Sequence, residues 1–363
     1  MNDYNDIFDN MSFDDIYDIS IDESEIFEVE NNNQNLTIIG RNKDLSNHLK
    51  VAERFVDKVL NHPDVKFELT SRGGHSVLTP AIWARQLPSL MKIQELEDSN
   101  YHLSEHLKLV QQTMAGFKSE IFLKPERSGC HPEKANWELL NNAIELIRTT
   151  AKTPEFKTTV ERRNTRARRQ FLSARGYITN LFDWYARLLI LRIDFGYRKC
   201  LDGQPVSVEQ AKKDWKRLLD NRKGKPTLFK TMVGYICRVE YGADKGVHLH
   251  TTLFLNGANS QNDPYLTHAI GGYWRDVITQ GDGLFFNCNR KKRKYFYCGI
   301  GMINHHDVVL RENLLRAVAY LAKKDLYLRI APEHGRVFFR GEIQALTEKR
   351  TGRPRSNSNA TQI

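Results

Sequence analysis

Residues 228–255 read LFKTMVGYICRVEYGADKGVHLHTTLFL, which is the pattern of two strands joined by a tight turn. From Leu228 to Tyr241, β-branched and aromatic residues alternate with other types, which is typical of a strand with two unlike faces. Residues 242–246 (GADKG) have the composition of a hairpin turn, and Val247–Leu255 continues as an apolar return strand. The stretch therefore predicts a long antiparallel hairpin.

Further strands and helices are expected on both sides of this hairpin. Leu188–Tyr197 (LLILRIDFGY) predicts a strand, and Ser207–Leu219 predicts a helix with Ser207 as its N-cap. More helices are expected over residues 263–278 and 307–324, and short strands over 284–288 and 294–302. The order β-α-β-β-α-β-α indicates an α+β fold, an antiparallel β-sheet with packed helices.

The flanks of this domain, which we place at residues 158–341, differ from it in pattern. Apolar residues recur at helical spacing between residues 45 and 150, which predicts a helical N-terminal region. Residues 1–36 are rich in acids and show no sustained period, so we expect an acidic disordered tail. Residues 349–363 are expected to be a basic disordered tail.

Charge is unevenly distributed along the chain. Residues 1–31 hold 11 of the 44 acids and none of the 54 Lys and Arg, so the remainder carries an excess of 21 positive charges. A body this basic indicates a polyanionic partner, nucleic acid before a membrane. No apolar run is long enough to span a bilayer, and the acidic N-terminus is unlike a secretory signal, so we expect a cytoplasmic protein. Five cysteines without a CxxC pair indicate neither a disulfide framework nor a zinc site.

Two basic runs are candidates for contact with DNA phosphates. Residues 161–176 contain six arginines and one acid, and residues 290–294 read RKKRK before Tyr295, Phe296 and Tyr297. The candidate DNA-binding residues are Arg162, Arg163, Arg166, Arg168, Arg169, Arg290, Lys291, Lys292, Arg293 and Lys294. A solvated helix face is the alternative for the first run. For the three aromatic residues we favour a packed strand over base stacking.

His248 and His250 form a candidate metal site. Because they lie two residues apart in a strand, both imidazoles project from the same face and can share a divalent ion. If the turn centres on Asp244, Glu240 lies directly opposite His248, with Cβ atoms about 5 Å apart. A carboxylate beside two imidazoles completes a ligand set with open positions. The alternatives are a hydrogen-bonded histidine pair and, for Glu240, a surface cross-strand pair.

Tyr320 is a candidate nucleophile. Residues 314–329 read LLRAVAYLAKKDLYLR, and as a helix they place Tyr320 away from the apolar stripe. Its helical neighbours are the cations Arg316, Lys323 and Lys324. Positive charge nearby favours the phenolate form, which covalent catalysis requires. The alternative is a surface tyrosine on a basic, DNA-facing helix.

Taken together, these features resemble the HUH endonucleases, and more narrowly the replication initiators of filamentous phages (inoviruses) and their prophage relatives. The resemblance spans roughly residues 158–341. The stretches that carry it, in the family's order, are Leu188–Arg198, Arg238–Gly257, Gly271–Trp274 and Ala317–Asp325.

The resemblance implies a site-specific single-strand DNA endonuclease that starts rolling-circle replication. His248 and His250 would hold Mg²⁺ or Mn²⁺ with Glu240 as third ligand. Tyr320 would attack DNA, leaving a 5′-phosphotyrosine link and a free 3′-OH, with Lys323 or Lys324 assisting; the family's spacing favours Lys323. The implied partners are a single-stranded or hairpin DNA origin and a host helicase or polymerase. The alternatives are an HUH relaxase or transposase, and a non-catalytic DNA-binding prophage remnant.

Overall fold

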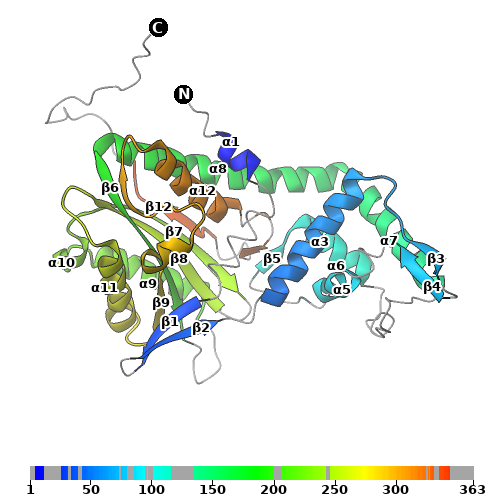
Figure 1. The fold of residues 1–363 in the computed structure, drawn as a ribbon, viewed down its shortest axis with the longest axis horizontal. Helices are drawn as coiled ribbons and strands as arrows, with labels where there is room; N and C mark the ends of the chain where they lie inside the picture. Colours follow the sequence, from blue (N-terminus) through cyan, green and yellow to red (C-terminus); the bar gives the residue numbers. More distant parts are fainter. Residues whose placement is uncertain are drawn as a thin grey trace, which may run out of the picture.

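The computed structural model shows an α+β protein whose largest sheet has eight strands, all paired antiparallel. Two parts are visible, a sheet domain and a helical N-terminal module, and α8 runs along both (Figure 1). The residues described are 5–11, 26–31, 34–39, 43–72, 75–79, 86–94, 96, 101–115, 134–198, 206–242, 246–323, 326, 328–330 and 335–343.

The predicted hairpin forms the middle of the sheet. Strands β7 and β8 pair antiparallel, and β8 also pairs with β6. The strand order is β12 (Phe338–Arg340), β7 (Met232–Gly242), β8 (Gly246–Asn256), β6 (Arg187–Tyr197), β9 (Gly283–Asn287), β1 (Ile26–Asn31) and β2 (Gln34–Ile39), and β10 (Gly301–Asn304) also pairs with β6. The predicted fold class is confirmed.

Helices cover both faces of the sheet because its central strands are apolar on both sides. One face packs on α8 (Pro154–Trp184) and α12 (Val308–Lys323). The other packs on α9 (Val208–Asp220), α10 (Pro226–Phe229), α11 (Asp263–Tyr273) and the π-helical turn Trp274–Ile278. Residues of β6 alternate between the two cores: Leu188 and Ile190 face α8 and α12, whereas Leu189 and Leu191 face the opposite helices.

The N-terminal module has its own core, so the predicted helical region is confirmed. Its helices are α3 (Lys43–Asn61), α5 (Leu87–Gln94), α6 (Glu105–Met114) and α7 (Lys134–Lys152). It also contains a hairpin, β3 (Glu68–Arg72) and β4 (His75–Thr79), that periodicity did not predict. Strand β5 (Tyr101–Leu103) pairs with β11 (Leu328–Ile330) from the C-terminal part of the chain.

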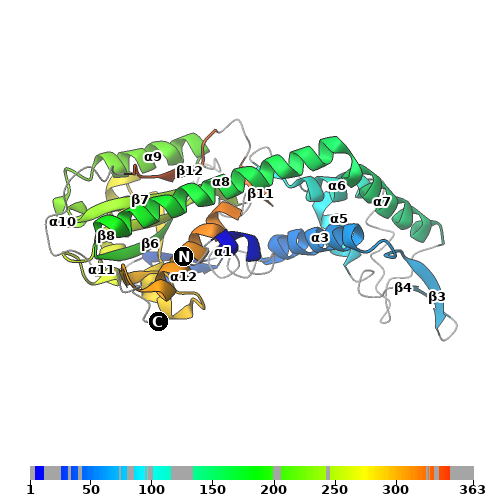
Figure 2. The same ribbon diagram turned by 90° about the horizontal axis from the view of Figure 1, so that it is seen from above.

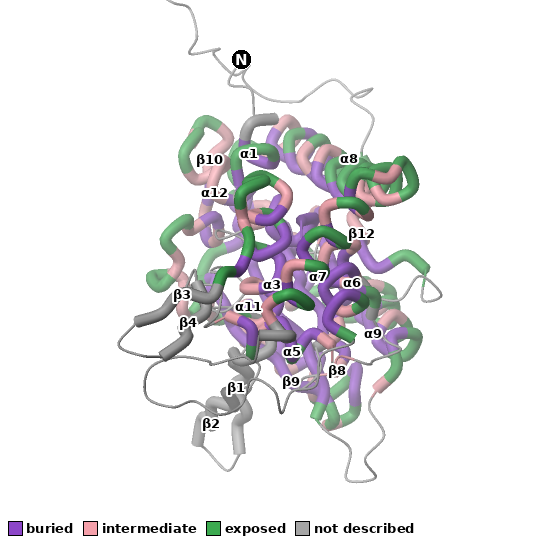
Figure 3. Tube along the Cα trace, turned by 90° about the vertical axis from the view of Figure 1, so that its right-hand side faces the viewer, coloured by how far each residue is buried: buried purple, intermediate pink, exposed green. Residues whose placement is uncertain are grey.

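Helix α8 joins the two parts. Its 31 residues correspond to a length of about 45 Å, and Thr153 caps its first turn by accepting a hydrogen bond from the Phe156 amide at 3.3 Å. Figure 2 shows α8 continuing from the sheet towards the module. In the burial view of Figure 3 much of α8 is exposed, while the interior of the molecule is buried.

The prediction of a disordered tail over residues 1–36 is wrong for the described part of that segment. Helix α1 (Asn5–Asn10), β1 and β2 all lie within it or extend from it. Ile7, Phe8 and Met11 are buried against α8 and α12, so a few apolar residues are enough to attach α1. Residues 349–363, predicted to be a basic tail, lie outside the described residues.

The strand predicted over residues 294–302 is also not formed as expected. Residues 288–294 are a 3₁₀ helix, started by the Asn287 side chain, which accepts a hydrogen bond from the Arg290 amide at 3.0 Å. The strand begins only at Gly301, which has a φ of +94°. The side-chain cap and the glycine thus turn the chain where composition predicted extended backbone.

Candidate metal centre

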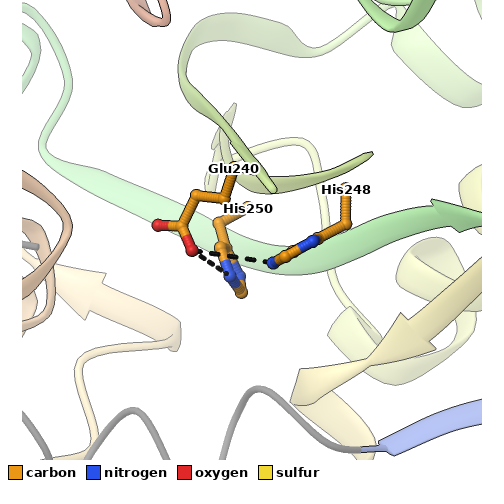
Figure 4. Close-up of side chains that lie close together, drawn as sticks. All are labelled: Glu240, His248 and His250. Atoms are coloured by element: carbon orange, nitrogen blue, oxygen red, sulfur yellow. Dashed lines mark ion pairs between the residues drawn. The ribbon is translucent and has the colours of Figure 1, made fainter. Parts of the chain in front are cut away.

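Glu240, His248 and His250 converge on one face of the β7–β8 hairpin (Figure 4). The predicted register is confirmed, because Glu240 pairs directly with His248. The Glu240 Oε2 atom lies 3.2 Å from His250 Nε2 and 3.6 Å from His248 Nε2. One candidate ligand atom from each residue lies within 4.8 Å of the others, so this group can bind a metal ion.

Hydrogen bonds on the far side of each ring orient both imidazoles. His248 Nδ1 lies 3.1 Å from the Gly246 carbonyl oxygen, which only accepts, so Nδ1 carries the proton and Nε2 is the basic nitrogen. His250 Nδ1 lies 2.7 Å from Asp194 Oδ1 and donates to that carboxylate in the same way. Both Nε2 atoms therefore face Glu240 as potential metal ligands. Such an outer hydrogen bond is the usual partner of a metal-binding histidine.

The site is shielded from water. The three residues are each no more than 4% exposed. Burial by itself lowers the pKa of His250, but the carboxylates of Asp194 and Glu240 outweigh this effect, so the pKa of His250 is raised above its ordinary value. A buried imidazole between two carboxylates has a strong affinity for positive charge, either a proton or a divalent ion.

Asp194 and Arg238 belong to the site, and sequence reasoning missed both. Asp194 on β6 and Arg238 on β7 are the direct cross-strand partners of His250 on β8, one on each side. The sequence contained the hairpin register but not the identity of the strand beside β8, so Asp194 could not be assigned. Arg238 could have been found, because it lies two residues before Glu240 and therefore on the same face.

Arg238 links the metal candidates to α12. Its guanidinium Nε lies 3.0 Å from Glu240 Oε1, and its Nη1 donates to the Leu321 carbonyl at 2.6 Å. Leu321 directly follows Tyr320 in the sequence. The backbone that carries the predicted nucleophile is therefore held to the predicted ligand set by one buried side chain.

The prediction that Tyr320 lies on a polar face of its helix is wrong. Tyr320 is fully buried in the core between the sheet, α8 and α1. The last turns of α12 are enclosed on more than one side, so residues 318–323 are all buried and the helix has no polar face there. Of its predicted cationic neighbours, Arg316 lies over the Tyr297 ring, at 4.7 Å from its centroid, and pairs with Glu312.

Lys323 contacts the N-terminal segment. Its Nζ atom donates to the Met11 carbonyl at 2.7 Å and lies 4.7 Å from the centroid of the Phe8 ring. Lys323 is 7% exposed, so this predicted assisting lysine is buried beside α1. Lys324, the other candidate, lies outside the described residues.

The family model described as the YagK/YfjJ C-terminal domain matches residues 149–336, just over half of the chain. The chain belongs to this prophage-associated family. The matched range contains Glu240, His248, His250 and Tyr320. No curated protein and no solved structure matches the chain.

Within the YagK/YfjJ C-terminal domain, the arginines predicted to contact DNA divide into two groups. Arg162, Arg166 and Arg169 line a groove of about 720 Å³ between α8 and the segment of β12, which adds Arg336 and Arg340. None of these five forms an ion pair within the described part of the chain. Among the described residues that line the groove, Glu161 is the only acid.

The other two candidate arginines of that run, Arg163 and Arg168, contact other parts of the protein. The Arg163 Nε atom lies 2.8 Å from Glu105 Oε2, and its Nη2 donates to the Leu103 carbonyl at 2.8 Å, which ties α8 to the N-terminal module. Arg168 pairs with Asp9 of α1 at 3.1 Å. Arg163 is therefore engaged away from the groove, contrary to a role in DNA contact.

The second basic run also divides. Lys292 lies 2.9 Å from Asp263 Oδ2, which also accepts from Asn289 at 2.8 Å, so Lys292 helps to hold the 3₁₀ helix on the domain. Arg290, Arg293 and Lys294 are exposed, and Lys291 is half-buried. Three of the five cations are therefore presented to solvent, whereas the half-buried Lys292 is held in an ion pair with Asp263. Among the described residues, no helix combines the length and apolar character that a membrane span requires.

Proposed function

We propose that this protein is a metal-dependent enzyme that nicks DNA and starts rolling-circle replication. The observation that carries the proposal is the orientation of the two imidazoles, whose basic Nε2 atoms both face Glu240 because their Nδ1 atoms donate elsewhere. In a histidine pair that serves only hydrogen bonding, there is no reason for both basic nitrogens to face the same carboxylate. In a metal site, this arrangement places three ligand atoms around one ion.

We propose Mn²⁺ or Mg²⁺ as the ion, with Mn²⁺ the better fit. Carboxylates suit both ions, whereas imidazole ligands favour transition metals over Mg²⁺. When bound, the ion would act as a Lewis acid on a phosphate oxygen and neutralise charge that develops there. Asp194 would hold His250 in the tautomer that binds metal, and Arg238 would hold the Glu240 carboxylate.

Tyr320 is the proposed nucleophile. Its phenolate oxygen would form a bond to phosphorus as the bond from phosphorus to the 3′ oxygen breaks. The departing 3′ oxygen takes up a proton, and the product is a 5′-phosphotyrosine link with a free 3′-OH. The link between Arg238 and the Leu321 carbonyl supports this role, because it connects the tyrosine's helix to the ligand set.

The burial of Tyr320 and Lys323 means that this reaction requires a rearrangement. Lys323 would have to exchange the Met11 carbonyl for the tyrosine oxygen or the phosphate, and α1 is attached at that point. The same burial favours the second candidate, a DNA-binding prophage protein that keeps the fold without nicking. In both cases we expect the groove of Arg162, Arg166 and Arg169 to bind the DNA backbone.

The two candidates are separated by a nicking assay on labelled single-stranded oligonucleotides of mixed sequence. The enzyme should produce a denaturation-resistant DNA adduct with Mn²⁺ and none with a chelator. His248→Ala and His250→Ala should abolish the adduct but retain DNA binding. A protein that binds these oligonucleotides tightly, binds Mn²⁺ at the three ligands and forms no adduct would be the non-catalytic alternative.

A further inference from the structure

Phe296 is the most exposed large apolar side chain in the described part of the protein, at 90% exposure. It lies in the segment between the 3₁₀ helix 288–294 and β10, where a packed strand was predicted. Its neighbour Tyr297 is 42% exposed, and the two rings are perpendicular with centroids 4.8 Å apart. An exposed phenylalanine does not contribute the stabilisation that its burial would give. We therefore consider that its exposed position serves contact with a partner.

The segment that presents Phe296 is held on α12. Asn313 of this helix donates to the Cys298 carbonyl at 3.2 Å, and Arg316 lies over the Tyr297 ring. The Gly299 backbone lies so close to the α12 backbone at Leu314 that a side chain at this position would collide with it. Phe296 therefore lies in a loop that is anchored to α12, the helix that carries Tyr320.

The surroundings of Phe296 are cationic. Arg290, Arg293 and Lys294 precede it in the 3₁₀ helix, are exposed, and form no ion pair among the residues that the structure describes. Two carboxylates on the elements that hold this segment are paired with other cations, Asp263 with Lys292 and Glu312 with Arg316. An apolar ring beside uncompensated positive charge matches a ligand that has both a flat apolar face and negative charge.

We propose that Phe296, with Tyr297 and the three exposed cations, is a stacking platform for unpaired bases of single-stranded DNA. Aromatic rings stack on any base, and cations beside them bind the phosphates that link the bases. Bases in a duplex are already stacked on each other, so the platform favours single strands. Phenylalanine has no hydrogen-bonding group and cannot read sequence, so the contact tolerates every base. The choice of DNA as the ligand rests on the proposed function.

The test is a binding measurement on the full chain in chelator, so that no nicking occurs. Fluorescence anisotropy would compare a labelled single strand with a duplex of the same sequence. Phe296→Ala should weaken single-strand binding about ten-fold and leave duplex binding unchanged. Tyr265→Ala is the matched control, because Tyr265 is an aromatic residue with 64% exposure on α11, and its removal should change neither affinity.

Two further variants separate stacking from an apolar protein contact. Phe296→Leu keeps an apolar side chain but not the ring, so it should bind single strands as weakly as Phe296→Ala. Phe296→Trp should bind at least as well as the natural protein, and its fluorescence should be quenched by stacked bases. Salt dependence is the slope of the logarithm of the binding constant against the logarithm of the salt concentration. Replacing Arg293 and Lys294 with Gln should reduce the magnitude of this slope by about 0.7 for each phosphate that is no longer neutralised, whereas Phe296→Ala should not change it.

The platform is rejected if Phe296→Leu binds single strands like the natural protein, or if Phe296→Ala weakens single-strand and duplex binding equally. Unchanged binding by Phe296→Ala also rejects it and would leave a protein partner as the reason for the exposed ring. These outcomes do not bear on the nicking proposal, which is tested by variants of the metal ligands and of Tyr320. Conversely, a protein that never nicks can still show the Phe296 effect.

Discussion

At the scale of single residues, the chemistry rests on which nitrogen of each histidine carries the proton. The Gly246 carbonyl and the Asp194 carboxylate accept from the Nδ1 atoms, and this leaves two Nε2 atoms beside one Glu240 oxygen. Asp194 is thus a positioning residue. Its effect on metal binding can be measured without any assumption about the DNA reaction.

Asp194→Asn should weaken Mn²⁺ binding about 10- to 100-fold, because the histidine loses the carboxylate that orients it and raises its basicity. Isothermal titration calorimetry measures this directly. Asp214→Asn is the control: Asp214 is also a buried carboxylate, but it accepts from Tyr197 on the opposite face of the sheet. Equal Mn²⁺ affinity in Asp194→Asn and the natural protein would show that Asp194 does not serve the site.

The raised pKa of His250 predicts how pH acts on the site. The stability that the protonated ring contributes is full below about pH 6.5, its ordinary pKa, and is lost as pH rises through the raised value. A divalent ion must displace that proton, so Mn²⁺ should bind more tightly as pH rises. The increase in Tm caused by Mn²⁺ should therefore grow with pH. An increase that is constant or larger at low pH would contradict the assignment of His250 as a ligand.

At the scale of secondary-structure elements, α8 performs two tasks with arginines that the sequence alone does not distinguish. Arg162 lines the open groove, and the adjacent Arg163 is half-buried against Glu105 and the Leu103 carbonyl. The run of six arginines indicated a basic helix correctly. It did not indicate which side of the helix the N-terminal module covers, because that depends on contacts between distant parts of the chain.

Substitution of the neighbouring residues Arg162 and Arg163 should therefore affect different properties, DNA binding for Arg162 and stability for Arg163. Arg163→Ala leaves Glu105 without its partner and should lower the free energy of unfolding by about 3 kcal/mol. Arg162→Ala should change stability by less than about 0.5 kcal/mol but weaken DNA binding and its salt dependence. Urea denaturation and anisotropy measure the two effects. Similar decreases in stability in both variants would contradict the division of α8 into a structural side and a binding side.

Helix α1 is the second element with a specific expectation. It attaches to α12 through buried Phe8 and through the hydrogen bond from Lys323 to the Met11 carbonyl. If the tyrosine must be uncovered before it reacts, deleting residues 1–11 should raise the rate of adduct formation roughly 5- to 30-fold, the factor that corresponds to about 1–2 kcal/mol of attachment energy. Arg168→Gln, which removes only the exposed pair with Asp9, should change the rate little. A slower reaction in a stably folded deletion variant would contradict a covering role for α1.

At the scale of the whole molecule, the sheet and the helical module were predictable, and their connections were not. Alternation in residues 228–255 was enough to place Glu240 opposite His248. Two features depend on long-range packing that periodicity does not predict: the pairing of β6 with β8, which adds Asp194, and the burial of Tyr320 in the core that the sheet, α8 and α1 share. The acidic composition of residues 1–31 concealed apolar residues that attach to the domain.

The central claim is that Tyr320 becomes linked to DNA in a reaction that needs Glu240, His248 and His250. The most direct measurement is peptide mapping by tandem mass spectrometry after incubation with single-stranded DNA and Mn²⁺. We expect a nucleotide on the peptide that contains Tyr320. It should be absent in Tyr320→Phe and in the presence of a chelator, and retained in Tyr177→Phe, which changes a buried tyrosine of the same core. An adduct on another residue, or one that persists in Tyr320→Phe, would contradict it.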